Sequence, residues 1–214
     1  METFEMKTSL SLLSAALLLT SASSVFAASS VDLTVKGLIT PSACAPSLSS
    51  GGVIDHGKIA SKDLKPDNWT VIGNHTLQLA ITCEAPTLVA LKGIDNVGDS
   101  HDPMNRYGLG LVSGQKLGGY SLTFGNPIAD NAAISVIESS DNGLTWQENI
   151  PGDTWPAAYL ASFGDRSTGS WAPTPVRLVT ADLKVQTLIA PTAGMDLTTE
   201  VPIYGSATIE VKYL

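Results

Sequence analysis

Two stretches of this 214-residue chain, residues 31–39 and 207–214, alternate apolar and polar side chains with a period of two. Such alternation predicts strands with one buried face, because successive side chains along a strand point to opposite sides. Either strand is therefore suited to pairing within one sheet or to being presented to a neighbouring molecule. The residues in phase are Val31, Leu33, Val35, Gly37 and Ile39 in the first stretch, and Ala207, Ile209, Val211 and Tyr213 in the second.

Helical periodicity is nearly absent after residue 28, and Gly, Pro, Asn and Asp separate many short apolar runs. Short strands with frequent turn residues predict an all-β, antiparallel β-sandwich. We expect residues 146–175, rich in Pro and Trp, to form a long loop or an insertion. The expected strands are 31–40, 76–83, 87–92, 109–112, 120–124, 134–139, 176–179, 181–188 and 207–213.

The first 27 residues have the pattern of an export signal. Lys7 precedes a short apolar run, and small residues around Ala27 favour cleavage before Ala28. The remainder, 28–214, is then expected to form a single domain. The formal net charge of −8 argues against a nucleic-acid partner, which would require clustered Lys and Arg.

An exported chain with two cysteines, Cys44 and Cys83, is expected to form one disulfide. Two free thiols are the alternative, and a metal site built on two cysteines alone is disfavoured. We expect no metal and no cofactor. The chain also lacks the Gly-x-Ser-x-Gly and phosphate-binding patterns of common enzymes, so we do not expect an enzyme.

Residues 36–44, Lys-Gly-Leu-Ile-Thr-Pro-Ser-Ala-Cys, resemble the first strand of chaperone–usher fimbrial subunits, in which a glycine precedes the first cysteine. Residues 77–83 resemble the strand of that family that ends at the second cysteine. Residues 207–214 resemble its last strand, whose penultimate residue is usually tyrosine, here Tyr213. The same resemblance extends to a fimbrial-like family of undefined function. One departure is Val201, which stands where the family commonly has glycine.

The resemblance implies an immunoglobulin-like sandwich that lacks its last strand, leaving a groove beside the strand that carries Ile209, Val211 and Tyr213. A periplasmic chaperone would fill this groove first. The donor segment, residues 28–39 of a neighbouring subunit, would then replace the chaperone by strand addition. An outer-membrane usher would complete export through the periplasm to a surface fimbrium. The resemblance also implies a role in adhesion, with host or surface glycans as further partners. The alternative is that residues 31–40 pair within their own sandwich.

A second hypothesis is a periplasmic or secreted carbohydrate-binding module. Trp155, Tyr159 and Trp171 would supply aromatic faces for stacking on a sugar. Asp99, His101 and Asp102 place a histidine among carboxylates, which we interpret as a solvated loop rather than a metal site.

Residues 139–146, Ser-Ser-Asp-Asn-Gly-Leu-Thr-Trp, resemble the Asp-box found in sialidases and other propellers. A propeller needs several such repeats, and this chain has one. We therefore expect a stable hairpin here and no glycosidase activity. Asp would cap the turn, Gly would allow a positive φ, and Trp would pack beneath.

Overall fold

The computed structural model describes residues 34–36, 43–98 and 106–214. The chain divides into two units, Met1–Ile39 and Thr40–Leu214. Of the first unit only residues 34–36 are described, and they have no regular secondary structure. The predicted signal peptide and most of the predicted strand 31–40 therefore lie outside the described residues.

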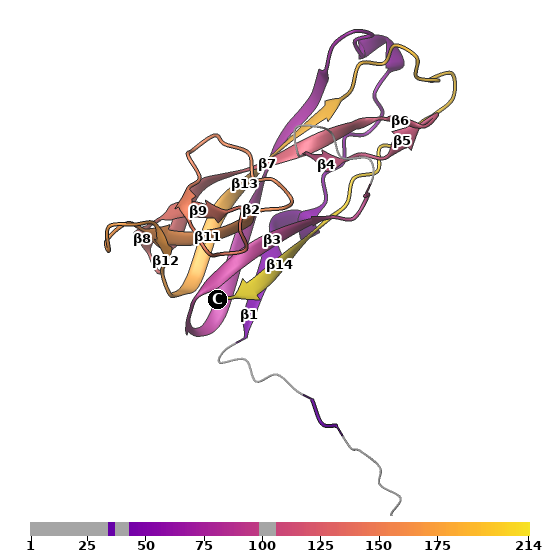
Figure 1. Cartoon of the computed structure of the whole chain (residues 1–214). Coiled ribbons are helices and arrows are strands. Elements are labelled where there is room, and N and C mark those ends of the chain that lie inside the picture. Colours follow the sequence, from indigo (N-terminus) through magenta and orange to yellow (C-terminus); the bar gives the residue numbers. More distant parts are fainter. Residues whose placement is uncertain (1–33, 37–42, 99–105) are drawn as a thin grey trace, which may run out of the picture. The chain divides into compact units, whose positions relative to one another are not determined.

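The first sheet of the second unit is antiparallel, and its strand order is β1-β2-β13-β7-β4, with β8 paired to β7 (Figure 1). The alternation of β2 and β13 sends one set of side chains inward, including Leu79, Ile81, Val179 and Leu183, each at most 1% exposed. Its strands are β1 (Cys44–Leu48), β2 (Thr70–Thr87), β4 (Tyr107–Gly108), β7 (Gly118–Ala129), β8 (Ala132–Ala133) and β13 (Val176–Ile189).

The second sheet is also antiparallel, in the order β10-β9-β11-β3-β14, with β12 paired to β11. The described residues also form a separate β5–β6 hairpin and two short 3₁₀ helices. The strands are β3 (Val89–Asp95), β9 (Ser135–Ser139), β10 (Gln147–Glu148), β11 (Leu160–Asp165), β12 (Ala172–Pro173) and β14 (Ala207–Tyr213). The hairpin is β5 (Leu111–Val112) with β6 (Gln115–Lys116), and the 3₁₀ helices are η1 (Ser49–Gly52) and η2 (Ser61–Asp63).

The main core lies between the two sheets, and Trp155, Phe124 and Phe163 form an aromatic cluster within it. A smaller apolar cluster lies beside the β5–β6 hairpin, around Leu109, Leu117 and Ile189. Because a buried side chain of this size contributes about 1.5–3 kcal/mol, the main core is the principal source of stability.

The strand order is that of an immunoglobulin-like sandwich, as expected. The order β1-β2-β13-β7 corresponds to A-B-E-D of that fold, and the β3–β14 pair corresponds to C-F. Strand G of the fold would pair with the outer edge of β14. Among the described residues, β14 pairs with β3 alone, so this position is unfilled.

A disulfide joins Cys44 to Cys83, confirming the predicted pairing. The two residues are opposite each other in the β1–β2 register. The bridge thus ties the edge strand of the first sheet to the 18-residue strand β2 at the point where β1 begins.

Residues 146–175 differ from the expected loop. They contain β11, which lies between β9 and β3 in the second sheet. Five consecutive residues of β11, 160–164, are buried, because both faces of this strand are covered. Period-two alternation, the signal by which strands were predicted, is therefore missing here.

Candidate functional site

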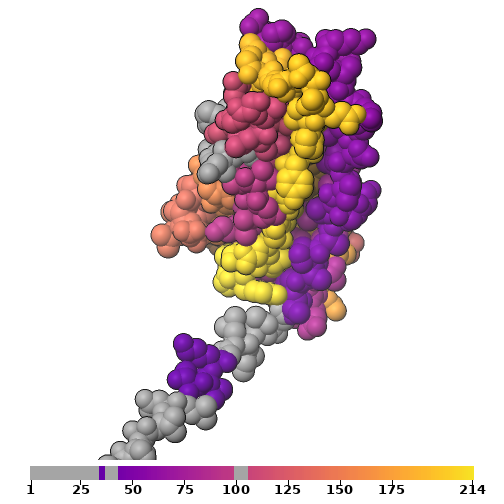
Figure 2. Space-filling view, turned by 90° about the vertical axis from the view of Figure 1, so that its right-hand side faces the viewer, coloured from indigo at the N-terminus to yellow at the C-terminus, as the bar shows by residue number. Residues whose placement is uncertain are grey.

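A groove of about 1230 Å³ lies along the gap between β1 and β14, the edge strands of the two sheets. Figure 2 shows this face, with yellow β14 beside the indigo segment that contains β1. One wall comes from β1 and the residues that follow it, up to Leu64. The opposite wall comes from residues 197–209.

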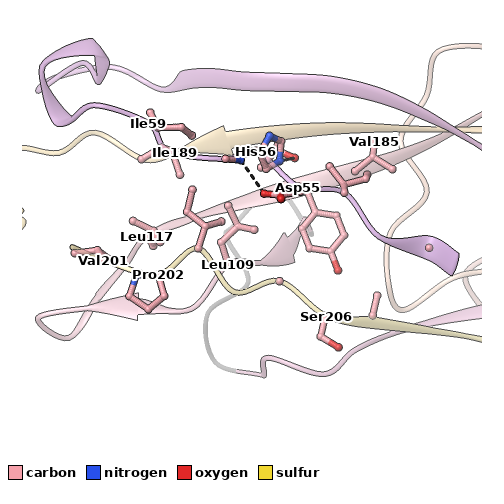
Figure 3. A pocket seen from close by; sticks show the side chains of 18 of the residues that line it. Asp55, His56, Ile59, Leu109, Leu117, Val185, Ile189, Val201, Pro202 and Ser206 are labelled. Carbon is pink, nitrogen blue, oxygen red and sulfur yellow. Dashed lines mark hydrogen bonds between the residues drawn. The ribbon is translucent and has the colours of Figure 1, made fainter. Parts of the chain in front are cut away.

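The floor of the groove is apolar. Leu77, Leu79, Leu183 and Val185 of the first sheet form its lower part. Leu109, Leu117 and Ile189 also line the groove, close to Val201 and Pro202 of residues 197–209 (Figure 3). A long apolar floor with few charged groups suits an extended apolar segment better than a polar metabolite.

Ile209 of β14 lines the groove, and Val211 has the same phase on that strand. Ile209 and Val211 pack on the main core, yet both remain partly exposed. The outer backbone edge of β14 has no ladder partner among the described residues. An unpaired edge beside exposed apolar side chains can accept a further strand.

Tyr213, outside the groove lining, connects the two edge strands. Its hydroxyl accepts a hydrogen bond from the backbone N–H of Cys44, at 2.9 Å. This bond joins the last strand of one sheet to the first strand of the other. The recognition role predicted for Tyr213 stays a prediction, because this hydrogen bond does not test it.

An ion pair between Lys58 Nζ and Glu200 Oε1, at 2.8 Å, connects the two walls of the groove. Both side chains are about nine-tenths exposed, so the pair contributes little to stability.

Two histidines that are isolated in sequence meet at the groove wall. The rings of His56 and His75 lie edge to face, with centroids 5.1 Å apart. His56 Nε2 also hydrogen-bonds the Thr187 hydroxyl, at 3.1 Å. Gly73 makes room for both rings, since a Cβ there would lie within 2.9 Å of each.

The pKa of His56 is lowered, chiefly by burial of the ring and next by the neighbouring His75, whereas Asp55 acts in the opposite direction. No sequence spacing could have revealed the pair.

Of the predicted donor residues only Val35 is described, and its side chain is 86% exposed. Val31, Leu33, Gly37 and Ile39 lie outside the described residues, as do Asp99, His101 and Asp102.

The three aromatic residues proposed to stack on a sugar are not brought together on one surface. Trp155 is 1% exposed, and its Nε1 donates to the carbonyl of Tyr159, so its ring lacks the free face that stacking requires. Tyr159 is half-buried against the same core. Trp171 lines a separate pocket.

The Asp-box forms the predicted hairpin, between β9 and β10. Asp141 accepts hydrogen bonds from the Ser139 hydroxyl and from both the N–H and the hydroxyl of Thr145. Gly143 has a φ of 91°, and a Cβ there would approach Trp146 to 3.5 Å. The motif therefore acts as a structural turn.

These hydrogen bonds lower the pKa of Asp141 from its ordinary 3.8 to about 2. Because the folded pKa is depressed, the carboxylate should stabilise the turn above about pH 4, and this contribution should be lost as the pH falls through 2. An NMR titration of the Thr145 amide should have its midpoint near pH 2. Thr145→Val should raise that midpoint, whereas Leu144→Ala, at an 85% exposed position, should not. A midpoint near 3.8 in the wild-type chain would contradict the assignment.

Within the described residues, no helix is long and apolar enough to cross a membrane. The same residues contain no group of three or more His, Cys, Asp or Glu side chains suited to a metal ion.

Comparison with known proteins finds one family model and two relatives that are similar to this chain. A family described as a protein of unknown function (DUF1120) matches residues 33–107. The chain is 26% identical over 228 residues to Protein GltF of Escherichia coli (strain K12), covering 86% of this chain and 88% of GltF. It is 27% identical over 226 residues to the uncharacterized protein YhcF of the same organism, covering 90% of this chain and 94% of YhcF. The two relatives thus align with most of this chain, whereas the family model matches residues 33–107 alone.

Proposed function

We propose that this protein is a structural subunit of a surface fimbria and assembles by donor-strand exchange. The observation that carries the proposal is the outer edge of β14, which no other described strand pairs with and which lies beside an apolar groove. The occupant is residues 31–39 of a second copy, which alternate with the period of a strand and end shortly before β1.

The chemistry of the two surfaces supports this pairing. The backbone of β14 supplies N–H and C=O groups for a ladder, and the apolar floor supplies pockets for alternate side chains. Each of Val31, Leu33, Val35 and Ile39 would contribute about 1.5–3 kcal/mol on burial, before the cost of ordering the segment. Gly37 would sit where the floor comes closest, since it has no Cβ.

A groove that no described strand covers would expose apolar side chains, which supports the need for a periplasmic chaperone before assembly and then an outer-membrane usher. A contribution to adhesion is part of the same proposal and rests on the family resemblance alone. We expect no catalytic step in this function.

The test is size-exclusion chromatography with light scattering on the mature chain, purified with and without a co-expressed periplasmic chaperone. Donor-strand exchange predicts a one-to-one chaperone complex in the first case and SDS-resistant polymers in the second. A stable monomer with one sharp melting transition, unchanged by a synthetic peptide of residues 29–40, would refute the proposal. That result would favour internal pairing of the N-terminal strand.

A further inference from the structure

A second pocket, of about 520 Å³, lies where β8, β12 and the end of β11 meet. It shares no lining residue with the groove between β1 and β14. Its volume is within the range of small-molecule sites. Figure 1 shows the β8 and β12 end of the sandwich that carries it.

One turn supplies the chemistry of this pocket. Residues 166–171 connect β11 to β12, and the flanking register pairs Asp165 with Ala172. Asp165 and Arg166 therefore enter from one end of the turn and Trp171 from the other, and all three line the pocket. The indole of Trp171 is partly exposed there, unlike that of Trp155.

The turn is held in place by its own hydrogen bonds. Ser167 N–H donates to Asp165 Oδ1 at 2.8 Å, and Gly169 N–H donates to the Arg166 carbonyl at 3.1 Å. Arg166 Nε donates to the Gly169 carbonyl at 3.3 Å, which fixes the direction of the guanidinium. A site prepared in this way loses little entropy when a ligand binds.

The polar groups retain capacity for a ligand. Asp165 accepts hydrogen bonds from the N–H and the hydroxyl of Ser167 and from the Thr174 hydroxyl, and a carboxylate can accept about four. The contacts of Arg166 use Nε, which leaves its two terminal NH₂ groups as donors. Asp130 differs, because its oxygens are engaged by the backbone N–H groups of Arg177 and Leu178.

We propose that this pocket binds a neutral saccharide, with one sugar face on Trp171 and sugar hydroxyls on Asp165 and Arg166. A sugar ring has an apolar C–H face that suits an indole, and its hydroxyls both donate and accept. The charges of Asp165 and Arg166 balance each other, and Asp130 then gives the pocket a net negative charge. A negative pocket disfavours anionic sugars such as sialic or uronic acids. The proposal does not depend on strand exchange at the groove.

The experiment is saturation-transfer NMR and calorimetry on the full mature chain with mannotriose, maltotriose, chitotriose and lactose as neutral probes, and sialyllactose as the anionic probe. We expect at least one neutral probe to bind and sialyllactose not to bind. Failure of every neutral probe at millimolar concentration would overturn the proposal, and so would binding of sialyllactose alone.

Substitutions in the pocket test whether the saccharide binds there. Trp171→Ala should weaken binding by about ten-fold or more, because a truncated aromatic anchor typically costs that much. Arg166→Gln should also weaken binding, and it serves as the second test if Trp171→Ala does not fold. Trp146→Phe, in the Asp-box turn, is the matched control and should leave the affinity unchanged. Binding that survives both pocket variants would place the sugar elsewhere and refute the assignment.

Discussion

Val35→Asp should abolish assembly of the mature chain, and Lys36→Asp should not. Donor-strand exchange buries Val35 in the apolar groove of the next copy, where an ionised carboxylate costs several kcal/mol. Lys36 has the opposite phase of the same strand and would face away from the floor. SDS-resistant ladders and light scattering measure the difference. Equal polymerisation of both variants would contradict the donor assignment.

A mixing experiment separates donor from acceptor. Ile209→Asp should damage the groove while leaving residues 31–39 intact, so this variant should also fail to polymerise alone. Mixed with the Val35→Asp variant, it should form a dimer and no longer polymer. The Ile209→Asp copy keeps an intact donor segment, and the Val35→Asp copy keeps an intact groove. Melting temperatures of the separate variants check that the sandwich itself is folded. A mixture that remains monomeric would show that the two surfaces do not meet.

Cys44→Ser should lower the free energy of unfolding by about 4 kcal/mol, the value that the chain-entropy model gives for a loop of this length. The bridge closes a separation of 39 residues between β1 and β2. Denaturant unfolding is best measured in the Val35→Asp background, where the chain is expected to stay monomeric.

The wild-type cysteines treated with a reducing agent provide the control, and they should show the same loss as Cys44→Ser. A loss below about 1 kcal/mol would mean that β1 is held mainly by its ladder with β2 and by the Tyr213 contact.

Strands whose apolar and polar side chains alternate could be predicted well from the sequence. Residues 207–213 were expected as a strand and form β14 with the same bounds. The two expected strands 176–179 and 181–188 are parts of one strand, β13, which runs through Thr180. By contrast β11 was missed, because a strand covered on both faces has no polar phase.

The groove could be anticipated only through family resemblance. Its lining comes from segments that are far apart in the sequence, namely β1, β13 and residues 197–209. No local sequence pattern predicts that these segments lie side by side. The same applies to His56 and His75, which are brought together across Gly73. Trp155 and Trp171 lie in the same Pro-rich and Trp-rich stretch, and the sequence does not distinguish them. In the structure Trp155 is buried in the core, whereas Trp171 lines a pocket.

The place of the disulfide has a mechanical consequence. In a polymer of such subunits, tension would arrive along the N-terminal segment and enter the sandwich at Cys44, the first residue of β1. The covalent bond to Cys83 passes that load directly to β2, which is paired with β13 along most of its length. The five residue pairs between β1 and β2 would therefore not be peeled apart one by one. Reduction of one bond should make the fibre yield at lower force, because the rate of forced unfolding is set by the barrier that this bond raises.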